Sequence, residues 1–98
     1  MKSGIEQIQA ERQKQIDKYG YTGEHHAQHP EWYDKGQLIE AARTLTMPKI
    51  LSVFVPINWD AEWFERLCQR PFQERIVIAA ALLASELDRQ NNLPKNEA

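Results

Sequence analysis

The sequence lacks the residues that several common kinds of site require. It holds one cysteine, Cys68, among 98 residues, so it can form neither an internal disulfide nor a cluster of thiolate metal ligands. The longest apolar run covers residues 76–84, which is too short to span a membrane. The stretch MKSGIEQIQAERQKQ has no apolar core. We therefore expect no signal peptide and a cytoplasmic protein.

Basic charge is also scarce. The chain has 12 lysines and arginines against 14 acidic residues, which gives a net charge of −2. A protein that binds nucleic acid by neutralising phosphates needs a basic face, so the composition argues against that class. The sequence has no glycine-rich phosphate loop, no H-E-x-x-H helix and no nucleophile elbow. The absence of these motifs leaves the catalytic residues, if the protein has any, unknown.

The residues that are present predict a single all-α domain, residues 1–98, built as a small bundle of three to four helices. Apolar residues recur at helical spacing in four segments, 3–19, 35–47, 60–69 and 71–91, and capping or stop residues flank them. The apolar stretch 50–55 is predicted to be a loop that covers the core, and residues 92–98 a frayed tail. Because so short a chain buries a modest core, we expect a homodimer.

Two charged residues interrupt the apolar pattern of the first and last predicted helices. Arg12 lies in the centre of a stripe formed by Ile5, Ile8, Ile16 and Tyr19. Glu86 lies one turn beyond residues 76–84, which are apolar all round and therefore predict a central buried helix. An unpaired buried charge is costly, so Glu86 needs a partner. Arg12 is the candidate from another helix, and Arg89 is the local alternative.

All three histidines lie in the short stretch EHHAQHP, residues 24–30. His25 and His29 are four residues apart, a spacing that metal sites use on helices, and His26 lies beside them. Nearby glycines and a proline argue against a stable helix here. The main prediction is therefore a hydrogen-bonded loop and no cofactor. A divalent-metal site, or a histidine that contacts a ligand or takes part in catalysis, remains an alternative.

Two tryptophans fall in predicted loops. If the two loops meet, Trp32 and Trp59 would line a pocket at one end of the bundle, and their rings would then stack on a ligand. Packing within the loops is the alternative. Trp63 is predicted to face the core of its helix.

With these residues in view, the chain resembles a family of small bacteriophage and prophage proteins. The shared pattern consists of ERQKQIDKYGYTGEHH at residues 11–26, GQLIEAA at 36–42 and RIVIAAALLASELDR at 75–89. A tryptophan-rich loop in the family is similar to INWDAEWFER at residues 57–66. The resemblance covers most of residues 5–90. It implies a phage or prophage origin and a helical fold, and it implies no established activity.

The resemblance also points to a set of polar residues, and this set includes Arg12 and Glu86. The candidate polar site consists of Glu11, Arg12, Gln15, Glu24, His25, Glu86 and Arg89, and Gly20 matches the pattern as well. His26 stands where the family typically has aspartate. If that aspartate is a metal or catalytic ligand, this chain has lost the activity or changed the metal. If it caps a loop, the substitution is mild.

We therefore expect a non-enzymatic binding or accessory protein with a protein or small-molecule partner. One alternative is a nucleotide pyrophosphohydrolase similar in architecture to the all-α MazG-like group. Glu62 and Glu65 lie one turn apart, but the four converging carboxylates that such magnesium chemistry needs are not evident. A second alternative is a regulator that binds a host protein through Trp32 and Trp59.

Overall fold

The computed structural model describes residues 2–94, and this part of the chain is helical without strands. The helices are α1 (Gly4–Tyr19), α2 (Gly23–Ala27), α3 (Pro30–Tyr33), α4 (Gln37–Leu45), α5 (Ala61–Cys68) and α6 (Phe72–Asn91). The all-α prediction is confirmed, and α1, α4, α5 and α6 correspond to the four predicted segments. The one-turn helices α2 and α3 form where a loop was predicted. Of the predicted frayed tail, residues 92–94 are not helical and 95–98 lie outside the described residues.

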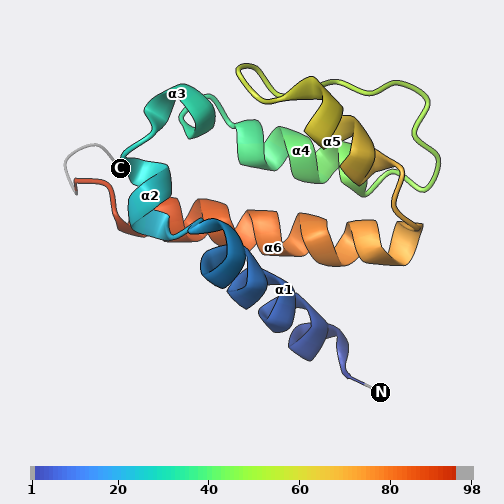
Figure 1. Cartoon of the computed structure of the whole chain (residues 1–98), viewed down its shortest axis with the longest axis horizontal. Coiled ribbons are helices and arrows are strands. Elements are labelled where there is room, and N and C mark those ends of the chain that lie inside the picture. Colours follow the sequence, from blue (N-terminus) through green and yellow to red (C-terminus); the bar gives the residue numbers. More distant parts are fainter. Residues whose placement is uncertain (1, 95–98) are drawn as a thin grey trace.

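Helix α6 is the longest element, and most of the others pack on it. In Figure 1, α4 lies along one side of α6, α1 crosses it obliquely, and α2 sits over its C-terminal end. Helix α5 packs on α4 and leads through a short turn into α6. The buried apolar core lies mainly between these elements and consists of Tyr33, Leu38, Ala41, Ala42, Leu45, Phe64, Ala79 and Leu82.

Local signals in the sequence account for both ends of α1. Ser3 accepts a hydrogen bond from the backbone N–H of Glu6, and the Glu6 side chain accepts one from the N–H of Ser3. At the other end Gly20 has a φ of 69°, a left-handed conformation that glycine adopts without steric cost. Its N–H donates to the carbonyl groups of Gln15 and Ile16, about one turn before the end of the helix, in agreement with the predicted stop.

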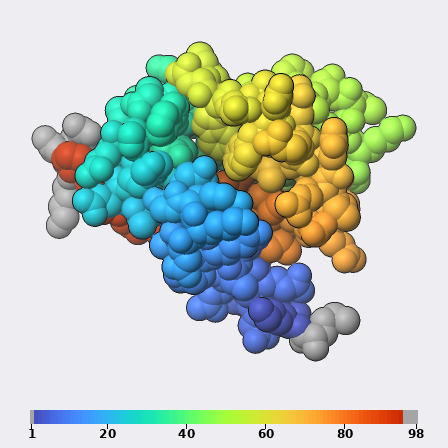
Figure 2. Space-filling model, viewed as in Figure 1, coloured from blue at the N-terminus to red at the C-terminus, as the bar shows by residue number. Residues whose placement is uncertain are grey.

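The predicted apolar stripe of α1 is wrong as a description of its buried face. The buried residues of α1 are Arg12 and Gln15, whereas Ile5 is 78% exposed and Tyr19 is 46% exposed. The reason is the oblique crossing, because the N-terminal part of α1 projects beyond the other helices (Figure 2). The C-terminal half of α1 thus presents polar side chains to α6.

The prediction that residues 76–84 are buried on every side is also wrong. Ile76 is 41% exposed and Leu83 is 45% exposed, and Leu87 one turn later is 62% exposed. Helices α1, α2 and α4 cover other faces of α6 and leave this one open to solvent. Within the described residues, no helix is long and apolar enough to cross a membrane.

The segment between α4 and α5 is a loop without a strand, as predicted, but most of it does not cover the core. Leu51 is 82% exposed and Phe54 is 70% exposed, while Val55 and Pro56 are the residues that turn inward. The start of the loop is tied to α6 by Arg75, which is 6% exposed. Its guanidinium donates to the carbonyl oxygens of Leu45, Met47 and Pro48.

Candidate functional site

The predicted pair between Arg12 and Glu86 does not form. Arg12 instead donates from Nε and Nη2 to Oδ2 of Asp88, at 2.9 and 2.7 Å, and from Nη1 to the carbonyl oxygen of Tyr21 at 2.7 Å. Residues 86 and 88 point about 200° apart around an ideal helix, and α1 crosses the side that carries Asp88. Arg12 therefore joins α1, the turn after it and α6.

Glu86 is held by its own helix, which was the local alternative. Arg89 donates to both carboxylate oxygens, at 2.9 and 2.7 Å, and Gln90 donates to one of them at 2.8 Å. Burial raises the pKa of Glu86, but these hydrogen bonds outweigh burial and hold the pKa below its ordinary value. Glu86 and Arg89 thus form a closed ion pair. Glu24 lies elsewhere, on the exposed side of α2, where it accepts from Gln28 at 3.3 Å.

His25 and His26 lie on the one-turn helix α2, which corrects the expectation that no stable helix forms there, and His29 is the N-cap residue of α3. Thr22 caps α2 by accepting a hydrogen bond from the N–H of His25 at 3.0 Å. The Nδ1 atoms of His25 and His26 are 3.3 Å apart, and His29 stacks on Trp32 with ring centroids 4.5 Å apart. Within residues 2–94, no group of three or more His, Cys, Asp or Glu side chains is arranged to hold a metal ion.

His26 is the buried member of the three, with 2% of its surface exposed. Burial is the main cause that lowers its pKa from 6.5 to about 4, and the neighbouring His25 and Arg12 lower it further. His26 is therefore a neutral imidazole at physiological pH. Because one Nδ1 must donate to the other, His25 and His26 carry opposite tautomers when both are neutral.

The lowered pKa makes stability depend on pH. Between pH 6.5 and about 4, the unfolded chain binds a proton at His26 that the folded chain does not. The free energy of unfolding should therefore fall by about 3 kcal/mol as the pH falls through this range. Above pH 6.5 the contribution of His26 to stability should be complete. Urea denaturation at several pH values measures the change. His26→Gln should flatten this slope, whereas the same slope in wild type and His26→Gln would contradict the assignment. His29→Gln, at a half-exposed histidine, is the matched control.

Trp32 and Trp59 line one cavity of about 490 Å³, which we call the aromatic pocket. Its lining includes Tyr21, His25, His26, Tyr33 and Trp63 as further aromatic side chains, together with Gln15, Leu38, Asn58, Asp60, Arg66, Leu82 and Ser85. The two tryptophan loops are joined directly, because the indole N–H of Trp59 donates to the carbonyl oxygen of Trp32 at 2.7 Å. Asn58 donates to the carbonyl oxygen of Glu31 at 2.8 Å and strengthens the same junction.

Two residues that line this pocket each carry a buried polar atom without a hydrogen-bond partner within the described residues: Oε1 of Gln15 and Oγ of Ser85. Gln15 is 6% exposed and Ser85 is fully buried. The amide nitrogen of Gln15 donates to Oε2 of Glu11 at 3.2 Å, which fixes the orientation of the amide and leaves its oxygen free to accept. Buried polar groups are almost always satisfied, so two unsatisfied ones in a single cavity need an explanation.

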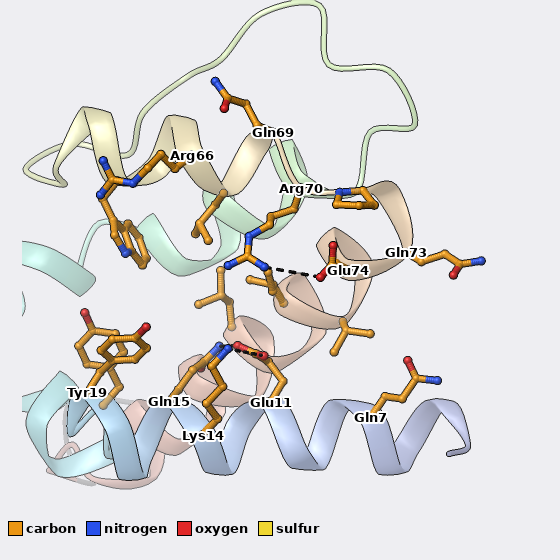
Figure 3. A pocket seen from close by; sticks show the side chains of 17 residues that line it. Gln7, Glu11, Lys14, Gln15, Tyr19, Arg66, Gln69, Arg70, Gln73 and Glu74 are labelled. Atoms are coloured by element: carbon orange, nitrogen blue, oxygen red, sulfur yellow. Dashed lines mark hydrogen bonds and ion pairs between the residues drawn. The ribbon is translucent and has the colours of Figure 1, made fainter. Parts of the chain in front are cut away.

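A second cavity of about 830 Å³ adjoins the aromatic pocket, and we call it the polar groove. It lies between α1, α5 and the start of α6, and Figure 3 shows the long polar side chains that line it from both sides. The two cavities share Gln15, Tyr21, Trp63, Arg66 and Leu82. The groove carries Lys14, Arg66 and Arg70 as cations, and Glu11 and Glu74 as carboxylates.

The predicted polar site is thus divided among several places. Gln15 and His25 line the aromatic pocket, and Glu11 lines the groove. Arg12 and the Glu86–Arg89 pair are engaged in contacts between or within helices. Sequence reasoning missed Ser85, although it is the first polar residue after the apolar run 76–84 and that position was a usable signal. It also missed Tyr21, which no spacing singles out.

No family model, curated protein or solved structure matches this chain. The functional argument therefore depends on the geometry and chemistry of the two cavities.

Proposed function

We propose that this protein is a non-enzymatic binding module and that the aromatic pocket binds a small planar molecule. The observation that carries the proposal is the combination of stacking walls with two unsatisfied polar atoms, Gln15 Oε1 and Ser85 Oγ. Ligand sites are typically apolar and aromatic cavities of this size with a few convergent polar groups. A planar ligand that presents an N–H donor and an acceptor would stack on the walls, and it would satisfy both atoms once the side chains of Gln15 and Ser85 turn toward the cavity.

The pocket is held in shape by contacts that need no ligand. The hydrogen bond between Trp59 and the Trp32 carbonyl joins its two loops, and the buried amide of Gln37 donates to the carbonyl oxygens of Glu31 and Ile57 at 3.3 and 3.4 Å. A site that is already ordered loses less entropy when a ligand binds. These contacts therefore favour binding by stacking and hydrogen bonding.

The chemistry of the lining supports binding over catalysis. Ser85 Oγ has no basic partner within hydrogen-bond distance in the described chain, and a serine nucleophile needs one. Asp60 is engaged as the cap of α5, where it accepts from the N–H of Trp63 at 2.9 Å. His26 already contacts His25. Asp60 and His26 are thus both engaged in contacts within the fold.

The proposal is tested with uncharged heteroaromatic probes such as indazole and quinazolinone, and with cyclohexanol as a saturated control. Binding is followed through the tryptophan indole N–H signals in NMR spectra. The heteroaromatic probes should shift the signals of Trp32 and Trp63, and cyclohexanol should not. Trp32→Ala should weaken the binding of these probes about tenfold, because stacking on one aromatic ring contributes about 1–3 kcal/mol.

Phe54→Ala is the matched control, because Phe54 is an exposed aromatic residue of the 46–60 loop and does not line the pocket. It should leave binding unchanged. Equal responses to cyclohexanol and to the heteroaromatic probes, or equal losses in the two variants, would show that the pocket is not the binding site.

We further propose that the module works in the cytoplasm and is of the phage or prophage type that the sequence resembles. Support comes from the roles of the matching residues, because Arg12 joins helices and Gln15 lines both cavities. A regulator that inserts both tryptophans into a host protein is less well supported. Trp59 is half-buried, and its indole N–H is already bound to the carbonyl of Trp32.

The open face of α6 supports the proposal of a homodimer. Ile76, Leu83 and Leu87 lie on one side of the helix, and a second copy of the same face would bury them. Sedimentation velocity should show a dimer at high protein concentration, and Leu83→Glu should convert it to a monomer. Leu51→Glu, in the exposed loop, should leave it a dimer. A wild-type monomer at every concentration would refute the proposal.

A further inference from the structure

We infer that the ligand is a mononucleotide, with its base in the aromatic pocket and its phosphate in the polar groove. This inference rests on the proposed function, because it requires the aromatic pocket to be a binding site. Its starting point is that the two cavities share five lining residues, Gln15, Tyr21, Trp63, Arg66 and Leu82. A single ligand with one flat apolar end and one anionic end can therefore occupy both.

The base is inferred from the two unsatisfied atoms. Gln15 Oε1 can only accept a hydrogen bond, and Ser85 Oγ can donate or accept one. The edge of a nucleobase carries N–H donors next to carbonyl or ring-nitrogen acceptors. It can therefore satisfy both atoms, once the side chains of Gln15 and Ser85 turn toward the cavity, while its faces stack on the tryptophans. An aromatic hydrocarbon would fill the same volume and leave both atoms unsatisfied. The pocket chemistry thus favours a base over a plain ring.

The phosphate is inferred from the charges of the groove. Glu11 lies 3.8 Å from the Lys14 ammonium, and Glu74 lies 3.5 Å from the Arg70 guanidinium. Figure 3 shows Arg70 reaching toward Glu74 on one side, with Lys14 and Glu11 together on α1 opposite. Arg66 has no carboxylate within ion-pair distance in residues 2–94, and it lines both cavities. Its guanidinium is therefore the group best placed to bind a phosphate next to a base.

A single phosphate fits the groove better than a nucleic-acid strand does. The groove contains three cations against two carboxylates, and the whole chain has a net charge of −2. A polyanion would need a continuous basic track, which this composition does not provide. The occupant we infer is therefore a free nucleotide with one phosphate group.

The test compares nucleosides with their monophosphates on the intact chain. Adenosine, uridine and their 5′-monophosphates are titrated while tryptophan fluorescence is recorded. Each monophosphate should bind about tenfold more tightly than its nucleoside, because a charge-assisted arginine–phosphate contact is among the stronger hydrogen-bond interactions. Arg66→Gln should abolish this advantage, so that each nucleoside and its monophosphate bind with the same affinity. Arg43→Gln, an exposed arginine of α4 outside both cavities, should leave the advantage intact.

The outcomes separate this inference from the proposed function. Equal affinities for nucleoside and monophosphate would overturn the phosphate assignment while the pocket stands as a site. Equal effects of Arg66→Gln and Arg43→Gln would overturn the assignment of Arg66. A short oligothymidylate that binds more tightly than the monophosphates would replace the mononucleotide with a strand. If heteroaromatic probes bind and nucleotides do not, the inference fails alone; if neither binds, the proposed function fails with it.

Discussion

Replacing Arg75 with methionine is expected to lower the free energy of unfolding by about 3–4 kcal/mol, because four backbone carbonyl groups around a buried guanidinium lose their charged donor at once. Arg75 donates to the carbonyl oxygens of Leu45, Met47 and Pro48, and from Nε to that of Arg70 at 3.0 Å. Methionine keeps most of the apolar length of the side chain. The loss therefore reports the hydrogen bonds and not a cavity.

Urea denaturation measures this loss. Arg75→Lys should recover part of it, because an ammonium group donates hydrogen bonds but lacks the planar fork of the guanidinium. Arg43→Met on the exposed side of α4 is the matched control and should change stability by less than about 0.5 kcal/mol. A similar small change for Arg75→Met would mean that water replaces the guanidinium without cost.

The second large effect is expected at Gly23, where α2 touches α6. A Cβ atom at this position would lie 2.5 Å from the carbonyl oxygen of Asp88 and 2.6 Å from Nδ2 of Asn92. The first of these is backbone and cannot rotate away, so α2 must move off α6. Gly23→Ala should therefore lower the free energy of unfolding by about 2–3 kcal/mol, although alanine normally stabilises a helix relative to glycine.

Gly4→Ala is the control, because a Cβ there meets nothing within 4 Å. This substitution should be neutral or stabilise α1 by up to about 1 kcal/mol. Gly23→Ala should also weaken binding of the heteroaromatic probes, because α2 carries His25 and His26 in the pocket wall. Thermal denaturation of the two variants compares the stabilities directly. Equal melting temperatures for Gly23→Ala and Gly4→Ala would show that the α2–α6 contact yields easily.

The elements of this fold could be predicted because their signals are local. The Ser3–Glu6 capping box, the Gly20 stop and the Asp60 cap each act within a few residues, and all three are present in the structure. The packing of those elements depends on contacts between distant residues. Periodicity alone assigned Ile5 to the core, whereas the angle at which α1 crosses α6 leaves it exposed. That angle is a property of the assembled helices.

The contrast between local signals and distant contacts also explains which parts of the candidate site were predicted. A charged residue in an apolar stripe correctly indicated that Arg12 is buried and needs a partner. It did not identify the partner, since Asp88 and Glu86 differ by two residues in the sequence and lie on different sides of α6. Burial of Gln15 was not predicted either, because a glutamine at a helical position carries no signal of its own.

The hydrogen bond from Gln15 to Glu11 should also change the electron distribution within the Gln15 amide. The amide nitrogen donates to Glu11, which lines the polar groove, while Gln15 itself also lines the aromatic pocket. A carboxylate that accepts from an amide N–H draws the amide toward its charge-separated resonance form and increases the electron density on the oxygen. Neutralising Glu11 should therefore make Gln15 Oε1 a poorer acceptor, without displacing an atom in the pocket. The charge of the Glu11 carboxylate in the groove would thus alter, through the Gln15 amide, the hydrogen bond to a ring that stacks in the pocket.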